Sequence, residues 1–206
     1  QYYLTEMNTA FDILRPVFES FKDTKDVEME IRLGRVNRGA FDTNVGKGVF
    51  DVVLKGLQKY DGWEKTIETE ADIFYKDNLR MMFEGDSDEA DGAIMKKKIK
   101  KVDCVLEGRP FDIRFGVATE KPTAVFDPND ADRQKNRKRW SFVRKNLSID
   151  MSIVSDGGAF DPDAEDDTCY QIELEIIDPK AVKDIDTMYN LFWKVEDILK
   201  LLPSNK

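Results

Sequence analysis

Histidine is absent from this 206-residue sequence. Its absence excludes Ser-His and Cys-His pairs for nucleophilic catalysis and every zinc site that uses imidazole. A bound metal must then be held by oxygen ligands, which favours Mg²⁺, Mn²⁺ or Ca²⁺.

Cysteine is scarce and long apolar runs are missing. Cys104 and Cys169 are the two cysteines, too few for a disulfide framework, so an intracellular, reducing location is expected. No apolar run is long enough to span a membrane and no signal peptide opens the chain, so no membrane partner is expected. The sequence begins at Gln1 and ends just after a predicted helix. We therefore expect a single domain over residues 1–206, taken from a longer protein.

Positive charge is also in deficit, but its distribution is uneven. The 32 Lys and Arg against 41 Asp and Glu give a formal charge of −9, which argues against a general nucleic-acid coat. Residues 133–145 are nevertheless strongly basic, and residues 161–167 strongly acidic. The acidic run lacks an EF-hand pattern, and we expect it at a hairpin tip.

Two distant segments alternate strictly between apolar and polar residues, as strands with one buried face do. The first is 27–34 (VEMEIRLG) and the second is 170–177 (YQIELEII). On their polar faces, Glu28 and Glu30 share a side, as do Glu173 and Glu175. Two acids at i and i+2 repel unless a cation lies between them. The presence of such an acidic pair on each of two strands suggests that both pairs bind one cation.

Between these segments the sequence predicts further short strands at hairpin spacing, with helices mostly at the two ends. The strands are expected at 66–75, 79–83, 93–106, 111–120, 137–144 and 147–154, and the helices at 5–22, 49–60 and after Asp178-Pro179. The predicted class is α+β, with an antiparallel sheet that closes into a barrel rather than a doubly wound sheet. The facing of 93–106 stays open, because Ile99 and Val102 fall on opposite parities.

A closed barrel would turn one face of every strand into an enclosed space. Solvated outer faces are the alternative for any single strand. The expected inward acids are Glu28, Glu30, Asp72, Asp112, Glu120, Asp150, Glu173 and Glu175, and the inward bases are Arg32, Arg80, Arg114, Arg137, Arg139 and some of Lys96, Lys98 and Lys100. Such a set suits a divalent metal at an acidic end and a polyphosphate held by Arg and Lys.

The motifs resemble those of the triphosphate tunnel metalloenzymes, in the branch of the fungal and DNA-virus RNA 5′-triphosphatases of mRNA capping. The resemblance rests on E-x-E-x-R at 28–32, E-L-E at 173–175, R-K-R-W-S at 137–141, S-I-D-M-S at 148–152, and 112–114 through Glu120-Lys121-Pro122. Related tunnel enzymes with E-x-E-x-K carry Lys where this chain has Arg32, which favours the capping branch. The nearest resemblance is to the N-terminal domain of giant-virus capping enzymes.

The resemblance implies an eight-stranded tunnel with assigned roles. Glu28, Glu30 and Glu175, with Glu173 close by, would hold Mg²⁺ or Mn²⁺. Glu120 would orient the attacking water, and Asp150 would position a neighbouring base. The implied phosphate-binding side chains are Arg32, Arg80, Lys98, Arg114, Arg137 and Arg139.

The expected function is hydrolysis of the γ-phosphate of triphosphate-ended RNA, with NTP hydrolysis as a side activity. A covalently linked guanylyltransferase domain is the expected partner, and a virion or host cytoplasm the location if the source is viral. Three alternatives stay open: an inorganic tripolyphosphatase or thiamine triphosphatase, a non-catalytic barrel that binds polyphosphate or RNA ends, and a guanylyltransferase read from K-x-D-G at 59–62. For that last motif, a helix end is the preferred interpretation.

Overall fold

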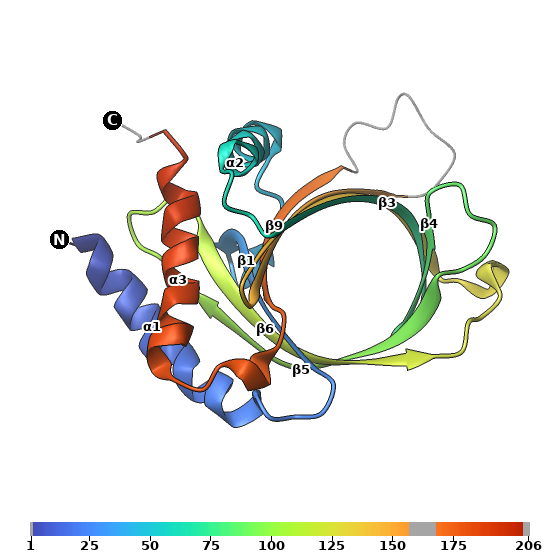
Figure 1. Cartoon of the computed structure of the whole chain (residues 1–206), viewed down its shortest axis with the longest axis horizontal. Coiled ribbons are helices and arrows are strands. Elements are labelled where there is room, and N and C mark those ends of the chain that lie inside the picture. Colours follow the sequence, from blue (N-terminus) through green and yellow to red (C-terminus); the bar gives the residue numbers. More distant parts are fainter. Residues whose placement is uncertain (1, 157–167, 204–206) are drawn as a thin grey trace.

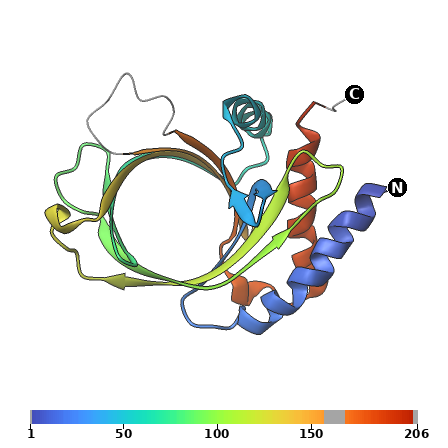
Figure 2. The same cartoon turned by 180° about the vertical axis from the view of Figure 1, so that it is seen from behind.

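Eight strands of the chain close into one antiparallel barrel, which Figures 1 and 2 show end-on in the computed structural model. The structure describes residues 2–156 and 168–203. Within these ranges the barrel strands are β1 (Val27–Asn37), β3 (Lys65–Lys76), β4 (Leu79–Glu84), β5 (Gly92–Cys104), β6 (Asp112–Thr123), β7 (Arg133–Arg144), β8 (Leu147–Asp156) and β9 (Cys169–Ile176). They run in the order β1-β6-β5-β4-β3-β7-β8-β9, and β1 pairs with β9 to close the barrel. The predicted closed antiparallel barrel is confirmed. The acidic run 161–167 lies outside the described residues.

The helices lie outside the barrel. α1 (Tyr2–Phe21) and α3 (Ile185–Lys200) lie together on one side, and α2 (Lys47–Lys59) lies near β9 (Figure 1). The short 3-10 turns are η1 (Pro128–Asp130) and η2 (Pro179–Ala181). None of the described helices has the length and apolarity that a membrane crossing needs.

The prediction that a helix begins directly after Asp178-Pro179 was wrong. Pro179 opens only η2, for which the Asp178 carboxylate accepts the N–H of Lys180. The chain then extends at Val182, whose side chain is buried, before α3 begins at Ile185. The extended segment therefore anchors the approach to α3 in the core.

The apolar core lies between the barrel wall and the helices. Met29, Ile31 and Leu33 of β1 are buried in this core, whereas Glu28, Glu30 and Arg32 line the barrel interior. The period-2 alternation of β1 thus separates a structural face from a chemical face. In the same core, Phe50 of α2 packs edge-on against ring side chains of β7 and β9.

The short strand β2 (Ala40–Asp42) folds back onto the end of β1. It approaches so closely that a Cβ on Gly34 would lie 2.2 Å from the backbone oxygen of Asp42 and 2.4 Å from the ring of Phe41. Glycine at position 34 therefore allows Phe41 to lie beside the end of the barrel.

A β-bulge fixes the facing of β5. Lys98 pairs with Ala118 and Lys100 pairs with Val117, so Ile99 is an extra residue in the strand. The bulge shifts the alternation by one. As a result Lys96, Lys98 and Lys101 share the tunnel side, while Val102 turns toward the core. This shift explains the opposite parities of Ile99 and Val102 in the sequence.

Two residues expected inside the tunnel do not contribute there. Asp72 lies on the outer face of β3, where it accepts a hydrogen bond from Asn136, and Ile73 lines the interior instead. Asp112 accepts the backbone N–H groups of Val36 and Leu106, so its carboxylate ties strand ends together. Both expectations were wrong. For Asp72 the reason is that alternation groups residues into faces but does not say which face is enclosed. Asp112 shares the face of Arg114, but backbone N–H groups occupy its carboxylate.

The packing of α2 gives a stability prediction. Phe50 is fully buried, with its ring centroid 5.4 Å from that of Tyr170 and 6.1 Å from that of Trp140. Phe50→Ala is expected to lower the free energy of unfolding by about 3–5 kcal/mol, because it removes this ring and leaves a cavity. Val52→Ala on the same helix is the matched control, since Val52 is 40% exposed. Urea unfolding followed by tryptophan fluorescence measures both, and equal midpoints for the two variants would contradict this account of the packing.

Candidate active site in the barrel interior

The two strands that carry the glutamate pairs, β1 and β9, lie side by side. In the β1–β9 ladder, Glu30 pairs with Glu175 and Arg32 pairs with Glu173. Residues directly opposite in an antiparallel ladder point to the same side of the sheet. The two motifs, far apart in the sequence, therefore meet on the inner wall of the barrel.

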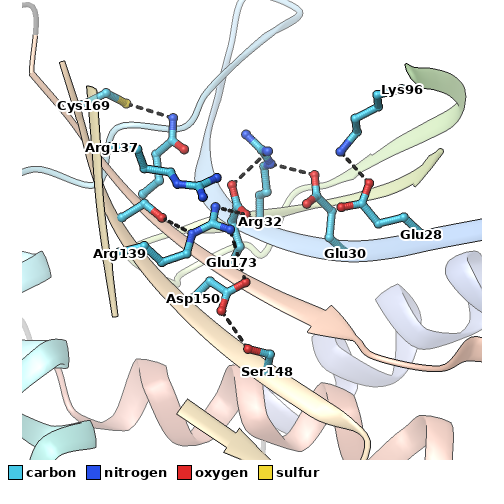
Figure 3. Close-up of polar contacts among 12 residues, drawn as sticks. Glu28, Glu30, Arg32, Lys96, Arg137, Arg139, Ser148, Asp150, Cys169 and Glu173 are labelled. Carbon is cyan, nitrogen blue, oxygen red and sulfur yellow. Dashed lines mark hydrogen bonds and ion pairs between the residues drawn. The ribbon is translucent and has the colours of Figure 1, made fainter. Parts of the chain in front are cut away.

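Arg32 joins these two strands through ion pairs. Its Nε lies 2.9 Å from Glu30 Oε1, and its Nη2 lies 2.9 Å from Glu173 Oε1 (Figure 3). Burial alone would lower the pKa of Arg32, but Glu173 and Glu30 more than offset this and raise it. Arg32 therefore stays charged inside the barrel and holds both carboxylates in place.

A second arginine approaches Glu173 from β7. Arg139 Nη2 lies 3.5 Å from Glu173, and its Nη1 lies 3.8 Å from Asp150 (Figure 3). Its Nε donates to Ser152 Oγ at 2.8 Å. Asp150 also accepts a hydrogen bond of 2.7 Å from Ser148. Asp150 thus lies behind Arg139, and the positioning role that the resemblance implies for it stays a prediction.

The two glutamates of β9 differ in charge state. Burial alone would raise the pKa of Glu173, yet Arg32 and Arg139 hold it below its ordinary value. For Glu175, burial and the nearby Asp150 raise the pKa to about 7. Glu173 is therefore already matched by two guanidinium groups, and Glu175 is the member of the pair that lacks sufficient positive charge.

A second acidic group forms around Lys96. Its Nζ lies 2.5 Å from Glu28 Oε2 and 3.2 Å from Glu120 Oε1. Burial raises the pKa of Glu28 to about 8, Lys96 opposes the rise, and Glu30 and Glu120 add to it. The sequence left Lys96 among several equivalent lysines. Its position opposite Glu120 in the β5–β6 ladder, which the sequence did not show, distinguishes it.

The donor set fits a divalent cation. Within the described residues, no three acidic or cysteine side chains meet as a preformed metal-ligand group, because Lys96 and Arg32 bind Glu28 and Glu30. The set is nevertheless all oxygen, and burial, with a smaller contribution from neighbouring carboxylates, raises the pKa of Glu28 and Glu175 and so disfavours their charged forms. A hard cation with oxygen ligands would offset that charge.

The basic wall fits an anion. Burial, together with the neighbouring Arg139, lowers the pKa of Arg137 to about 10. Its Nε is buried and makes no hydrogen bond with any described residue. A buried guanidinium N–H without an acceptor is costly, and a phosphate oxygen would supply that acceptor.

Two connected cavities make up the interior, of about 460 Å³ and about 440 Å³. The residues common to both are Glu28, Glu30, Arg32, Arg80 and Lys96. The larger extends to Arg137, Arg139, Glu120, Glu173 and Glu175, and the smaller to Lys98 and Arg114. The structure thus brings the predicted residues to one tunnel, with Asp150 behind its wall.

Arg114 occupies a different setting from the other predicted phosphate ligands. Its guanidinium makes two hydrogen bonds to Asp103, of 2.6 and 2.9 Å, and lies over the ring of Phe41 at 4.6 Å. Its charge is therefore already matched by a carboxylate.

The K-x-D-G segment lies away from the tunnel. Lys59 is exposed as the last residue of α2 and lines neither of the two cavities. This position agrees with the interpretation of the segment as a helix end.

Solved structures of low sequence identity share this fold. The RNA triphosphatase Pct1 of S. pombe matches with a TM-score of 0.77 at 15% identity, over 95% of this chain and 93% of that one. The triphosphatase of the mimivirus capping enzyme matches with a TM-score of 0.60 at 13% identity, over 93% of this chain and 97% of that one. At such identities the likeness shows the fold, and it confirms the expected tunnel architecture.

A sequence match identifies the family of this chain. No curated protein matches the chain, but residues 62–202 match the family described as mRNA capping enzyme, beta chain. This segment covers more than half of the chain and spans β3 to α3. The chain therefore belongs to the mRNA capping enzyme beta-chain family, the RNA triphosphatase branch that its motifs predicted.

Proposed function

We propose that this chain hydrolyses the β–γ phosphoanhydride of triphosphate-ended RNA and that it needs Mg²⁺ or Mn²⁺ to do so. The products would be diphosphate-ended RNA and inorganic phosphate. The observation that carries the proposal is the closure of β1 onto β9, which places four glutamates against a wall of Arg and Lys in one tunnel. Membership of the capping-enzyme family supports RNA as the substrate.

The basic side chains would bind and orient the triphosphate. Arg137 offers an unpaired N–H, and Arg139 offers a guanidinium already oriented by Ser152 and Asp150. Fixed donors that match developing charge stabilise a phosphoryl-transfer transition state without reorganisation. Arg80 of β4 lines both cavities and would contact the same phosphates from the strand beyond β3.

The acidic side chains would hold the metal and orient water. Glu28, Glu30 and Glu175 are the proposed ligands, with Glu173 fixed beside them by Arg32. The bound ion would supply Lewis-acid stabilisation and clamp phosphate oxygens. Glu120 would accept a hydrogen bond from the attacking water while Lys96 fixes its carboxylate. The expected route is direct attack by water without a covalent enzyme intermediate.

The wider setting is part of the same proposal. The mimivirus protein of similar fold is a domain of a capping enzyme, and we propose that a guanylyltransferase domain is linked to this chain in the same way. Capping activity also implies an intracellular location. A solved structure shows Pct1 in complex with the Spt5 CTD.

The metal assignment predicts a large and selective loss of activity. Glu175→Gln keeps the shape of the side chain but removes its charge, and turnover of triphosphate-ended RNA should fall by orders of magnitude. Glu70→Gln on the exposed outer face of β3 is the matched control and should leave turnover unchanged. Phosphate release measures turnover, and calorimetric titration with Mn²⁺ measures metal binding independently. Near wild-type activity in Glu175→Gln would remove Glu175 from the ligand set.

The phosphate assignment predicts that charge alone is insufficient at position 139. Arg139→Lys keeps the positive charge but cannot contact Ser152, Asp150 and a phosphate at once. We expect kcat to fall by roughly 10²-fold, the usual cost of one transition-state donor. Lys138→Ala is the control, because Lys138 points outward to Glu68. Equal kcat values for Arg139→Lys and wild type would show that no planar fork is required.

A substrate panel tests the function itself. Wild-type protein with Mg²⁺ or Mn²⁺ is expected to release phosphate from triphosphate-ended RNA, and to do so more slowly from ATP and tripolyphosphate. Removal of the metal with EDTA should abolish all release, and its return should restore it. No release from any substrate would favour a barrel that only binds polyphosphate. A preference for tripolyphosphate would favour the inorganic tripolyphosphatase alternative.

A further inference from the structure

The smaller cavity continues beyond the residues that it shares with the catalytic tunnel. We call this continuation the β5 cavity, and it is lined by Thr43, Ile99, Lys100, Lys101 and Arg114. The proposed reaction uses none of the first four. The β5 cavity is therefore a built extension of the site that still lacks a role.

The bulge in β5 creates the lining of this cavity. In a regular strand only alternate residues reach one face. Because Ile99 is an extra residue in β5, Lys98 and Lys101 both lie on the tunnel side, opposite Ala118 and Gly116. The stretch from Lys98 to Lys101 then lines one cavity without a gap. Bulges commonly re-aim side chains next to active sites.

The positive charge of the β5 cavity exceeds the negative charge beside it, because Asp103 interacts with both Arg114 and Lys101. Lys100 and Lys101 are exposed and form no ion pair or hydrogen bond with any described residue. Partial burial and the cationic neighbours Arg80 and Arg32 lower the pKa of Lys98. Asp103, which lies near these lysines, is bound by Arg114. This end of the tunnel thus attracts anions beyond those that the catalytic residues hold.

Beside the lysines of the β5 cavity lies a planar surface, formed by the guanidinium of Arg114 over the ring of Phe41. The guanidinium of Arg114 is fixed in orientation by both oxygens of Asp103 and lies on the ring of Phe41. Ile99 adds an exposed apolar side chain. Lysines beside planar and apolar side chains are the combination that binds single-stranded nucleic acid, because its phosphates and bases need both.

We propose that the β5 cavity binds the first nucleotides of the RNA chain, directly after the 5′-triphosphate. This inference rests on the proposed function and specifies its substrate. A free NTP ends after one nucleoside and would leave Lys100 and Lys101 without a phosphate to contact. The β5 cavity would therefore give the enzyme its preference for RNA over NTP.

The test compares two double variants that remove the same charge. Lys100→Ala with Lys101→Ala changes the β5 cavity, whereas Lys97→Ala with Lys121→Ala removes two exposed lysines that line neither cavity, from the outer faces of the adjacent β5 and β6. Fluorescence anisotropy with a 5′-diphosphate RNA decamer, the reaction product, measures binding without turnover. KM for the triphosphate decamer is compared with that for ATP, or with the Ki of ATP as a competitor.

The Lys100/Lys101 variant is expected to bind the decamer roughly tenfold more weakly at low salt, and the slope of log K against log salt should fall in magnitude by about 1.4 for two lost contacts. The ratio of KM for RNA to KM for ATP should rise by a similar factor. The Lys97/Lys121 variant should match wild type. Equal weakening in both variants, or in neither, would overturn the assignment. If wild type released no phosphate from RNA, the proposed function would fail, while the anisotropy data would still decide the β5 cavity.

Discussion

The bridge from Arg32 to Glu30 and Glu173 is the interaction on which the tunnel depends. It joins the first and last strands of the barrel, in which Arg32 and Glu173 are 141 positions apart in the sequence but directly opposite in the ladder. Buried carboxylates are stable only when they are paired and hydrogen-bonded. Arg32 meets that condition for one carboxylate on each strand, and it leaves Glu175 without a matching cation. Structural closure and the unequal compensation of Glu173 and Glu175 thus come from the same register.

The barrel separates stability from chemistry by reversing the usual positions of core and surface. Apolar side chains of β1 and β9 point outward beneath α1, α2 and α3, and charged side chains point inward. The helices are therefore needed for stability, because without them the apolar outward faces of β1 and β9 would be exposed to water. Stability resides in contacts such as that of Phe50 with the rings of β7 and β9. The interior is left free to carry a charge distribution selected for binding.

The sequence predicted most of this site because strand alternation is a local property. The faces of β1 and β9, the inward Arg137 and Arg139 and the outward Lys138 all followed from period 2 and from motif order. Two features did not follow. The extra residue Ile99 in β5 depends on the tertiary structure, because it keeps Val102 in the core. It also changes which face of the strand each later lysine occupies. The acids of β3 alternate as regularly as those of β1, and only barrel closure shows that Asp72 lies outside.

The charge pattern also implies that metal and triphosphate bind cooperatively. Burial raises the pKa of Glu28 and of Glu175, and the buried Arg137 carries an N–H without an acceptor among the described residues. In the proposed function, a cation would stabilise the ionised glutamates, and the triphosphate that it helps to hold would supply an acceptor for Arg137. Each ligand would therefore reduce the electrostatic cost of binding the other, and linkage requires such an effect to be reciprocal.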